Sequence, residues 1–493
     1  MSIDTIARQL ELRPNDPDTW AAAAHQLVDL GQAEAAVPIA IRASQLLPGH
    51  GSASLLALVL ARAGRADDAT RLVEALAGED PQDAAVWARL AQACTALDRH
   101  HDALVCRQNA VVCCPDDRRS RLLLAQQLER ADRRDEARAH ATWVLERAPD
   151  STLAQRVLMR LDHHDGDLTS AAARGRDLLQ RGGVEDDLVR TTAMEQARIC
   201  ARLGLPDEAV AAATLGNRLA LRAWKGSSAS LRASLAELQG RPRWPPIPDA
   251  VDEQGAFIVG FPRSGTTLMQ QILEQHPATR TLDESAALDR AVDAVMPGLS
   301  LAEQVDALTP ERAAQIRRLW RDQVGPGFVV DKLPLHLARI DLIARVFPGM
   351  PVVVMVRDPR DCVVSAFLQD FELNPAMAEL TDVGSAARLY RDVFSIWQRA
   401  RDAGGVRARE VRYEDLVRAP EQVLEGVLDF LGLPWDPSVL GERAGDVTTP
   451  SYRNVQEPLY DRSVQRWRVF EEHLLPAQPI LEPFVEGYGY PPA

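Results

Sequence analysis

The stretch AFIVGFPRSGTT, residues 256–267, sets the architecture of the second half of this chain. It begins with an apolar run typical of a buried strand, passes through a turn that contains Gly260 and Gly265, and enters a helical pattern that reaches His276. Glycines at this spacing allow backbone N–H groups to close around an anion at the N-terminus of a helix. The stretch therefore predicts a strand, a phosphate-binding loop and a helix.

The loop lacks the lysine of nucleotide triphosphatases. Those enzymes normally have lysine where Thr266 stands, with the following hydroxyl on magnesium. Gly-Thr-Thr therefore argues against the usual kinase or ATPase chemistry and favours a substrate with an anhydride other than that of a nucleotide triphosphate. Two rival classes stay open: a kinase or triphosphatase on a related loop, and a repeat-based adaptor whose second domain has lost catalysis.

The length of 493 residues is enough for two or three domains of ordinary size. The formal net charge of −14 speaks against a general nucleic-acid or anionic-membrane surface, although an acidic protein can still focus positive charge in one cleft. The six cysteines show no paired spacing typical of zinc. Residues 1–16 do not resemble a signal peptide, and no apolar stretch is long enough to span a bilayer. We therefore expect a cytoplasmic protein without a metal, a nucleic-acid partner or a membrane partner.

Prolines in the first half, at positions 14, 48, 81, 115 and 149, recur with a nearly constant period that is typical of stacked helical hairpins. The first four are followed, at a nearly fixed offset, by a turn residue and then by an alanine where only a small side chain can pack. The turn residues are Gly31, Gly64, Asp98 and Asp132. This pattern resembles the tetratricopeptide repeat, and weaker turn signatures continue beyond it. We expect an all-α solenoid over residues 1–235, whose surface can hold a peptide or a partner protein.

A proline-rich segment follows the repeats. Residues 236–254 include Arg-Pro-Arg-Trp-Pro-Pro-Ile-Pro, which breaks any helix, because proline lacks the N–H donor and pushes the preceding residue towards extended backbone. We interpret this segment as a linker to a second domain over residues 255–493.

The second domain alternates strand and helix patterns. Apolar strands are predicted at 327–331, 351–357 and 407–413, with helical patterns at 335–347, 359–370, 383–403 and 421–431. Continuous apolar strands covered by helices predict an α/β fold with a parallel sheet, and ligands are expected at the carboxyl ends of its strands. Arg263, Lys332 and Arg357 all stand at such ends. We therefore expect basic groups from three strands to meet at one edge of the sheet.

Two motifs together make this domain recognisable. Residues 261–267 and residues 356–365 (VRDPRDCVVS) resemble the paired binding motifs of sulfotransferases that use 3′-phosphoadenosine 5′-phosphosulfate. The resemblance implies that the 5′-phosphosulfate is held by Arg263, Ser264, Gly265, Thr266 and Thr267. It also implies that Arg357 and Ser365 hold the 3′-phosphate, a role to which a planar guanidinium and a neutral hydroxyl are suited.

Within this family, residues 255–490 are most similar to the tyrosylprotein sulfotransferases, and fusions of tetratricopeptide repeats to a sulfotransferase domain share the layout of the whole chain. The resemblance implies that Glu284 is the general base and that Lys332 and Arg263 stabilise the reacting group. It places Tyr413 beside the adenine nucleotide, and makes Ser451 a catalytic and donor-binding hydroxyl. By the same resemblance Arg466, the basic residue before a tryptophan, is expected to be a further donor-binding residue.

The acceptor is less constrained than the donor. Ala286 stands where the tyrosylprotein enzymes have an arginine that favours acidic peptides, although Arg290 keeps a second such position, and Gln369 replaces a basic residue beyond the second motif. A tyrosine of a peptide or protein, held by the repeats, is the first choice of acceptor. A carbohydrate or small-metabolite hydroxyl is the second, and a second copy of the chain is a further candidate partner. For Glu284, the alternative role is a carboxylate at the start of a helix.

Overall fold

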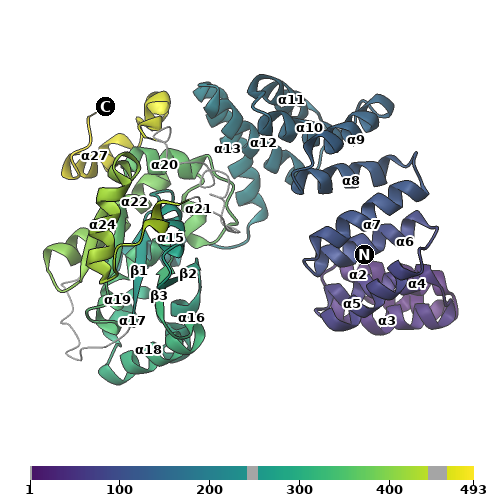
Figure 1. Cartoon of the computed structure of the whole chain (residues 1–493), viewed down its shortest axis with the longest axis horizontal. Helices are drawn as coiled ribbons and strands as arrows, with labels where there is room; N and C mark the ends of the chain where they lie inside the picture. Colours follow the sequence, from purple (N-terminus) through teal and green to yellow (C-terminus); the bar gives the residue numbers. More distant parts are fainter. Residues whose placement is uncertain (1–2, 241–253, 442–463, 493) are drawn as a thin grey trace. The chain divides into compact units, whose positions relative to one another are not determined.

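The computed structural model describes residues 3–240, 254–441 and 464–492, and the chain forms two compact units, Met1–Gly182 and Gly183–Ala493 (Figure 1). The domain limits expected at 235 and 255 stay predictions, because a unit that is defined by packing need not end where a sequence repeat ends.

The first unit consists of helices that pack in consecutive pairs, as the repeat pattern predicts. Its helices are α1 (Ile3–Leu12), α2 (Pro17–Asp29), α3 (Ala33–Leu46), α4 (His50–Arg62), α5 (Ala66–Gly78), α6 (Ala84–Ala96), α7 (His100–Cys113), α8 (Arg118–Arg130), α9 (Arg134–Arg147), α10 (Thr152–His164) and α11 (Leu168–Gln180).

The predicted turn residues all have left-handed backbone. The φ angles are 74° at Gly31, 76° at Gly64, 60° at Asp98 and 57° at Asp132, and Gly166 continues the series at 84°. Glycine and aspartate are among the residues that tolerate this conformation, which explains why they recur at the period of the repeat.

A hydrogen bond explains why the repeat prolines are accompanied by large residues. The indole Nε1 of Trp87 donates to the carbonyl of Pro81 at 2.6 Å, and Trp20 makes the equivalent bond to Pro14 at 3.0 Å. In a third repeat, Arg121 Nε takes the place of the indole and donates to Pro115 at 2.6 Å. The carbonyl of each of these three prolines therefore has a side-chain donor from the following helix.

The second unit contains a five-stranded sheet between helices. It begins with α12 (Asp186–Arg202), α13 (Pro206–Ala223) and α14 (Ala229–Gly240), and its strands are β1 (Gly255–Gly260), β2 (Thr279–Asp283), β3 (Phe328–Lys332), β4 (Val352–Val356) and β5 (Ala408–Arg412). The helices between the strands are α15 (Thr266–Glu274), α16 (Ala287–Val295), α17 (Leu301–Asp306), α18 (Pro310–Val324), η1 (Pro334–Arg339), α19 (Ile340–Val346), α20 (Pro359–Phe367), α21 (Pro375–Glu379) and α22 (Val383–Asp402). After β5 come α23 (Tyr413–Arg418), α24 (Pro420–Leu431), η2 (Pro437–Leu440), η3 (Arg466–Phe470), α26 (Glu471–Leu474) and α27 (Gln478–Gly487).

All pairings in the sheet are parallel, with strand order β2-β3-β1-β4-β5, which confirms the predicted fold class. The sequence did not reveal β2 as a strand, because its TRTLD pattern is polar and it lies at the edge of the sheet, where no residue is fully buried. In the ladder, Ile258 and Asp283 both pair with Lys332. This register brings the end of β2 beside the end of β3.

Alternate residues of β1 enter two separate cores. Phe257 and Val259 pack in a large core with aromatic residues such as Trp320, whereas Ala256 and Ile258 pack on the other face of the sheet. Every residue of β1 is buried. The strand is therefore covered on both faces, which explains its uninterrupted apolar sequence.

Helices α12–α14 belong to the packing of the second unit. Leu235 and Leu238 of α14 are buried in the same core as Phe257. The amide of Asn217 in α13 donates to the carbonyl of Phe367 at 3.1 Å. These helices therefore complete the unit that contains the sheet.

Candidate active site

The predicted phosphate-binding loop joins β1 to α15. Gly265 has φ of 100°, and a Cβ atom there would lie 2.7 Å from Cδ2 of Tyr413. A Cβ atom on Gly260 would lie 2.8 Å from the carbonyl oxygen of Met355. Both positions therefore require glycine, so that the loop can close against its neighbours.

The loop presents hydrogen-bond donors at the start of α15. Thr266 and Thr267 are the first residues of that helix, where backbone N–H groups lack intrahelical partners. Ser264 is fully buried, and its hydroxyl oxygen has no hydrogen-bond partner among the described residues. A buried hydroxyl without a partner is costly in an empty loop, so these donors fit a bound anion.

Positive charge is concentrated at the loop. Arg263 lies in left-handed backbone, with φ of 71°. Desolvation and the charges of Arg357, Arg466 and Arg198 lower the pKa of the Arg263 guanidinium to about 10. These arginines come from the loop, the segment after β4, η3 and α12. A bound anion near these guanidinium groups would relieve their mutual repulsion.

Arg357 is buried against the loop. Its Nη1 donates to the carbonyl of Arg263 at 2.9 Å, and its guanidinium carbon lies 4.6 Å from the centre of the Tyr413 ring. Burial opposes ionisation, but the charges of Asp361 and other acidic neighbours prevail and raise the pKa of Arg357. Ser365 lies close by, because its Oγ accepts a hydrogen bond from Arg263 Nε at 3.1 Å. The two binding motifs thus meet in space.

Lys332 is fully buried at the end of β3 and contacts two carboxylates. Its Nζ lies 3.0 Å from Oε1 of Glu284 and also pairs with Asp283. The backbone N–H of Glu284 donates to the carbonyl of Lys332 at 2.8 Å, and Glu284 has φ of 49°. The side chain of Glu284 is 44% exposed, so this carboxylate can contact a ligand while it keeps its ion pair with the buried Lys332.

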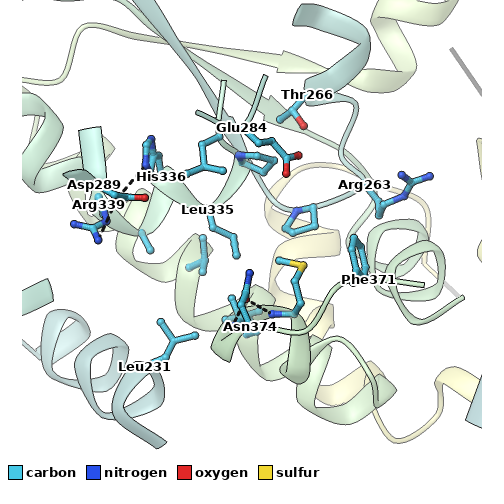
Figure 2. Close-up of a pocket in the computed structure, with 18 of the residues that line it drawn as sticks. Leu231, Arg263, Thr266, Glu284, Asp289, Leu335, His336, Arg339, Phe371 and Asn374 are labelled. Atoms are coloured by element: carbon cyan, nitrogen blue, oxygen red, sulfur yellow. Dashed lines mark hydrogen bonds and ion pairs between the residues drawn. The ribbon is translucent and has the colours of Figure 1, made fainter. Parts of the chain in front are cut away.

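A cavity of about 690 Å³ lies beside the phosphate-binding loop and the two carboxylates that contact Lys332. It is lined at one end by Arg263, Thr266, Thr267 and Glu284. Figure 2 shows Glu284 and Thr266 on one side of this cavity, with Leu231 and Asn374 on the other. A volume of this size is typical of a small-molecule site.

Asp361 ties the C-terminal segment to the second motif. Its carboxylate accepts hydrogen bonds from the backbone N–H groups of Gln465, at 2.9 Å, and Trp467, at 2.8 Å. These two residues flank Arg466. Burial raises the pKa of Asp361 to about 6, despite the nearby charge of Arg357. Asp361 therefore fixes the backbone that carries Arg466.

Residues 255–437 match the family model described as the sulfotransferase family, and residues 27–94 match a tetratricopeptide-repeat model. The chain carries a sulfotransferase domain. Both assignments agree with the resemblances that the sequence shows, and the loop, Lys332 and the second motif all fall inside the sulfotransferase domain.

Three curated relatives illustrate the similarity. The chain is 28% identical over 251 residues to an uncharacterized protein of Aquifex aeolicus, covering 47% of this chain and 32% of that protein. It is 28% identical over 218 residues to protein-tyrosine sulfotransferase 2 of Gallus gallus (37% and 52%), and 26% identical over 253 residues to protein-tyrosine sulfotransferase 1 of Danio rerio (43% and 64%). The chain thus spans between 32% and 64% of the lengths of these relatives. The solved sulfotransferase domain of the Synechococcus PCC 7002 olefin synthase aligns with a TM-score of 0.37 at 23% identity, covering 51% of this chain and 100% of that domain.

The structure brings most of the expected site residues of the sulfotransferase domain together. Tyr413 packs against the loop at Gly265, and Arg466 lies close enough to act on the charge of Arg263. Ser451 lies outside the described residues. The roles assigned to all these side chains stay predictions.

Arg198 was not found from the sequence. It lies in α12, ahead of the sulfotransferase domain, and its charge reaches Arg263 only through the tertiary packing of the second unit. No local pattern marks an arginine on a repeat-like helix as part of a distant anion site.

The alternative role of Glu284 at a helix start does not match its position. Helix α16 begins at Ala287, whose backbone N–H donates to the hydroxyl oxygen of Ser285 at 3.1 Å, so Ser285 rather than Glu284 serves the start of this helix. Arg290, which keeps a basic position of the tyrosylprotein enzymes, donates to Gln323 at 2.7 Å. Gln369 is buried.

Among the described residues, no helix is long and apolar enough to cross a membrane.

Proposed function

We propose that this chain transfers a sulfuryl group from 3′-phosphoadenosine 5′-phosphosulfate to an acceptor hydroxyl, with a tyrosine of a peptide or protein as first choice. The observation that carries the proposal is the cluster of arginines around a glycine loop, in which Arg357, Arg466 and Arg198 act on Arg263. A donor with phosphate groups at both the 3′ and 5′ positions, and a sulfate besides, supplies the negative charge that such a cluster favours.

The residues present fit this donor. The unpartnered hydroxyl of Ser264 and the N-terminus of α15 suit the 5′-phosphosulfate, because both offer neutral hydrogen-bond donors. Ser365 accepts one bond from Arg263 and still has its own hydroxyl proton to donate, so it can serve a 3′-phosphate together with Arg357.

Glu284 is suited to remove the acceptor proton. As the acceptor oxygen forms its bond to sulfur and the bond from sulfur to the 5′-phosphate oxygen breaks, the acceptor proton passes to this carboxylate, and 3′,5′-diphosphoadenosine leaves. Lys332, held at 3.0 Å from Glu284, places a fixed positive charge beside the reacting centre. Arg263 balances the charge that develops on the leaving oxygen. Ser451 stays a proposed further donor.

Transfer of radiolabelled sulfate from the donor into a cell extract tests the proposal. Label in protein supports the tyrosine acceptor, and label in small molecules or carbohydrate moves the acceptor to the second class. Calorimetric binding of 3′,5′-diphosphoadenosine, lost in Arg357→Ala, supports the donor site. Absence of donor binding by the wild type, or turnover of ATP with magnesium, overturns the sulfotransferase activity. That the repeats hold the acceptor, that the chain pairs with a second copy and that it is cytoplasmic stay predictions.

A further inference from the structure

Part of the cavity wall lies outside the matched sulfotransferase domain. The match begins at residue 255, yet Leu231 and Leu235 of α14 line the same cavity as Glu284 and Arg263. Figure 2 shows Leu231 across the cavity from Glu284. An acceptor whose hydroxyl reaches Glu284 therefore has α14 as its opposite wall.

Contacts near both ends of α14 fix this wall. The hydroxyl of Ser228, just before the helix, donates to the carbonyl of Pro375 at 2.7 Å. Arg232 forms an ion pair with the buried Glu379, and the guanidinium of Arg399 donates to the carbonyl of Leu238. Because Pro375 and Glu379 belong to α21, these bonds also position the α20–α22 connection, which supplies further cavity residues.

The side of the cavity away from the phosphate-binding loop is mainly apolar. The apolar lining on this side includes Leu231, Leu235, Leu335 and Leu389, and Phe371 adds an apolar side chain nearer Arg263. Aliphatic and aromatic side chains on facing elements favour an acceptor that buries apolar surface when it binds. This side therefore suits a hydrocarbon group better than a sugar.

The charges in the lining oppose an acidic acceptor. Carboxylates of Glu284, Asp289 and Glu372 line the cavity, and of its two arginines Arg263 belongs to the phosphate-binding loop. Arg339 is already engaged, with its guanidinium 3.2 Å from Asp289 and 2.8 Å from the amide oxygen of Gln304. Burial alone would raise the pKa of Asp289, but His336, whose Nε2 lies 3.4 Å from this carboxylate, and the charge of Arg339 lower it, so Asp289 stays ionised. A carboxylate on the acceptor would meet like charges and lose hydration.

We propose that the acceptor carries its hydroxyl on an uncharged apolar group, with an alkyl-substituted phenol as the type, and that α14 selects it through Leu231 and Leu235. This inference rests on the proposed sulfotransferase activity and narrows its acceptor, because a tyrosine acceptor would then need uncharged, apolar neighbours beside its phenol. Helix α14 thereby contributes to acceptor specificity although it lies outside residues 255–437, which match the sulfotransferase family model.

A matched pair of phenols tests the inference. The probes are para-pentylphenol and the same phenol with a terminal carboxylate on its alkyl chain, each assayed with the full chain and the sulfated donor. We expect kcat/KM to be roughly tenfold or more higher for the uncharged phenol, because desolvation and like-charge repulsion penalise the acid. Equal rates, or a preference for the acid, would overturn the inference.

Variants of α14 separate recognition from folding. Leu231→Ala should lower kcat/KM for para-pentylphenol by roughly tenfold, since contact with the alkyl chain is lost, and Leu231→Met should restore most of it. The matched control is Leu221→Ala in α13, whose side chain is 41% exposed and does not line the cavity. In all three variants the affinity for 3′,5′-diphosphoadenosine should equal that of the wild type. Unchanged transfer in Leu231→Ala removes α14 from acceptor selection.

Failure of the inference can be distinguished from failure of the proposed activity. If 3′,5′-diphosphoadenosine does not bind the wild type, the donor site itself is wrong. If it binds, and sulfate moves into other acceptors of an extract but into neither phenol, the sulfotransferase activity stands and the apolar acceptor class is refuted.

Discussion

Replacing Gly265 by alanine should destabilise the phosphate-binding loop, and the same replacement at Gly349 serves as a control for the free energy of unfolding. Gly265 and Gly349 both have positive φ, 100° and 85°. Alanine costs roughly 1–2 kcal/mol in left-handed backbone, and this penalty is common to both sites. At Gly265 the new Cβ would also lie 2.7 Å from the Tyr413 ring, whereas at Gly349 nothing lies within 4 Å. The Tyr413 ring is itself packed under Arg357 and has little freedom to retreat.

The difference between the two variants isolates the steric contact. Overpacking typically costs about 1–3 kcal/mol, so Gly265→Ala should lower the unfolding free energy by that much more than Gly349→Ala does. Hydrogen exchange of the β1 amides, which report opening of the second unit, measures both values. Affinity for 3′,5′-diphosphoadenosine should fall at least tenfold in Gly265→Ala, by roughly 1.4 kcal/mol, and stay unchanged in Gly349→Ala.

A Tyr413→Ala background provides the internal check. Without the ring, the extra penalty of Gly265→Ala should largely vanish, as expected for two positions in direct contact. Equal destabilisation by the two glycine replacements, together with equal donor affinity, would show that the loop does not close against Tyr413.

Three further predictions concern charged groups of the site. Glu284→Gln should lower the rate of sulfate transfer by roughly 10²–10⁴-fold and leave the calorimetric affinity for 3′,5′-diphosphoadenosine within threefold of the wild type; full activity would remove Glu284 from the reaction. Arg357→Ala should weaken the binding of 3′,5′-diphosphoadenosine by about 2–5 kcal/mol and the binding of adenosine 5′-phosphate far less. An equal loss of affinity for both nucleotides would contradict the assignment of Arg357 to the 3′-phosphate. Burial raises the pKa of Asp361 from an ordinary 3.8 to about 6, so between these pH values the folded chain keeps a proton that the unfolded chain has released. The contribution of Asp361 to the unfolding free energy is therefore lost as the pH rises through about 6, by about 3 kcal/mol in total. The difference in hydrogen-exchange stability between wild type and Asp361→Asn should shift by about 2–2.5 kcal/mol between pH 4 and pH 7, because pH 4 already lies just above the ordinary pKa of 3.8. A constant difference would refute the buried ionisation.

The parts of the site that are continuous in sequence could be predicted, and the parts assembled by packing could not. The loop follows from Gly260 and Gly265, because their backbone geometry leaves few alternatives. The strand patterns around Lys332 and Arg357 predicted that both residues stand at the carboxyl ends of parallel strands, and the parallel register confirms this placement.

Edge position and tertiary contacts explain what was missed. Strand β2 is partly exposed, so it lacks the apolar run that marks β1, although it places Glu284 beside Lys332. Arg198 and Leu231 lie in helices that precede the matched domain, within the residues 1–235 that the sequence pattern assigns to the solenoid. Only the folded unit shows that one adds charge to the loop and the other closes the cavity.

The position of α14 also bears on how such a protein can exchange its parts. Recombination that joined a different repeat array at residue 255 would preserve every residue of the matched domain and still leave one wall of the cavity behind. A junction before α12, near Gly183, would carry Arg198 and Leu231 along with the sheet. If α14 selects the acceptor as proposed, the segment that must be inherited together is longer than the matched domain, and recombination at residue 255 would alter acceptor choice while leaving the phosphate-binding loop intact.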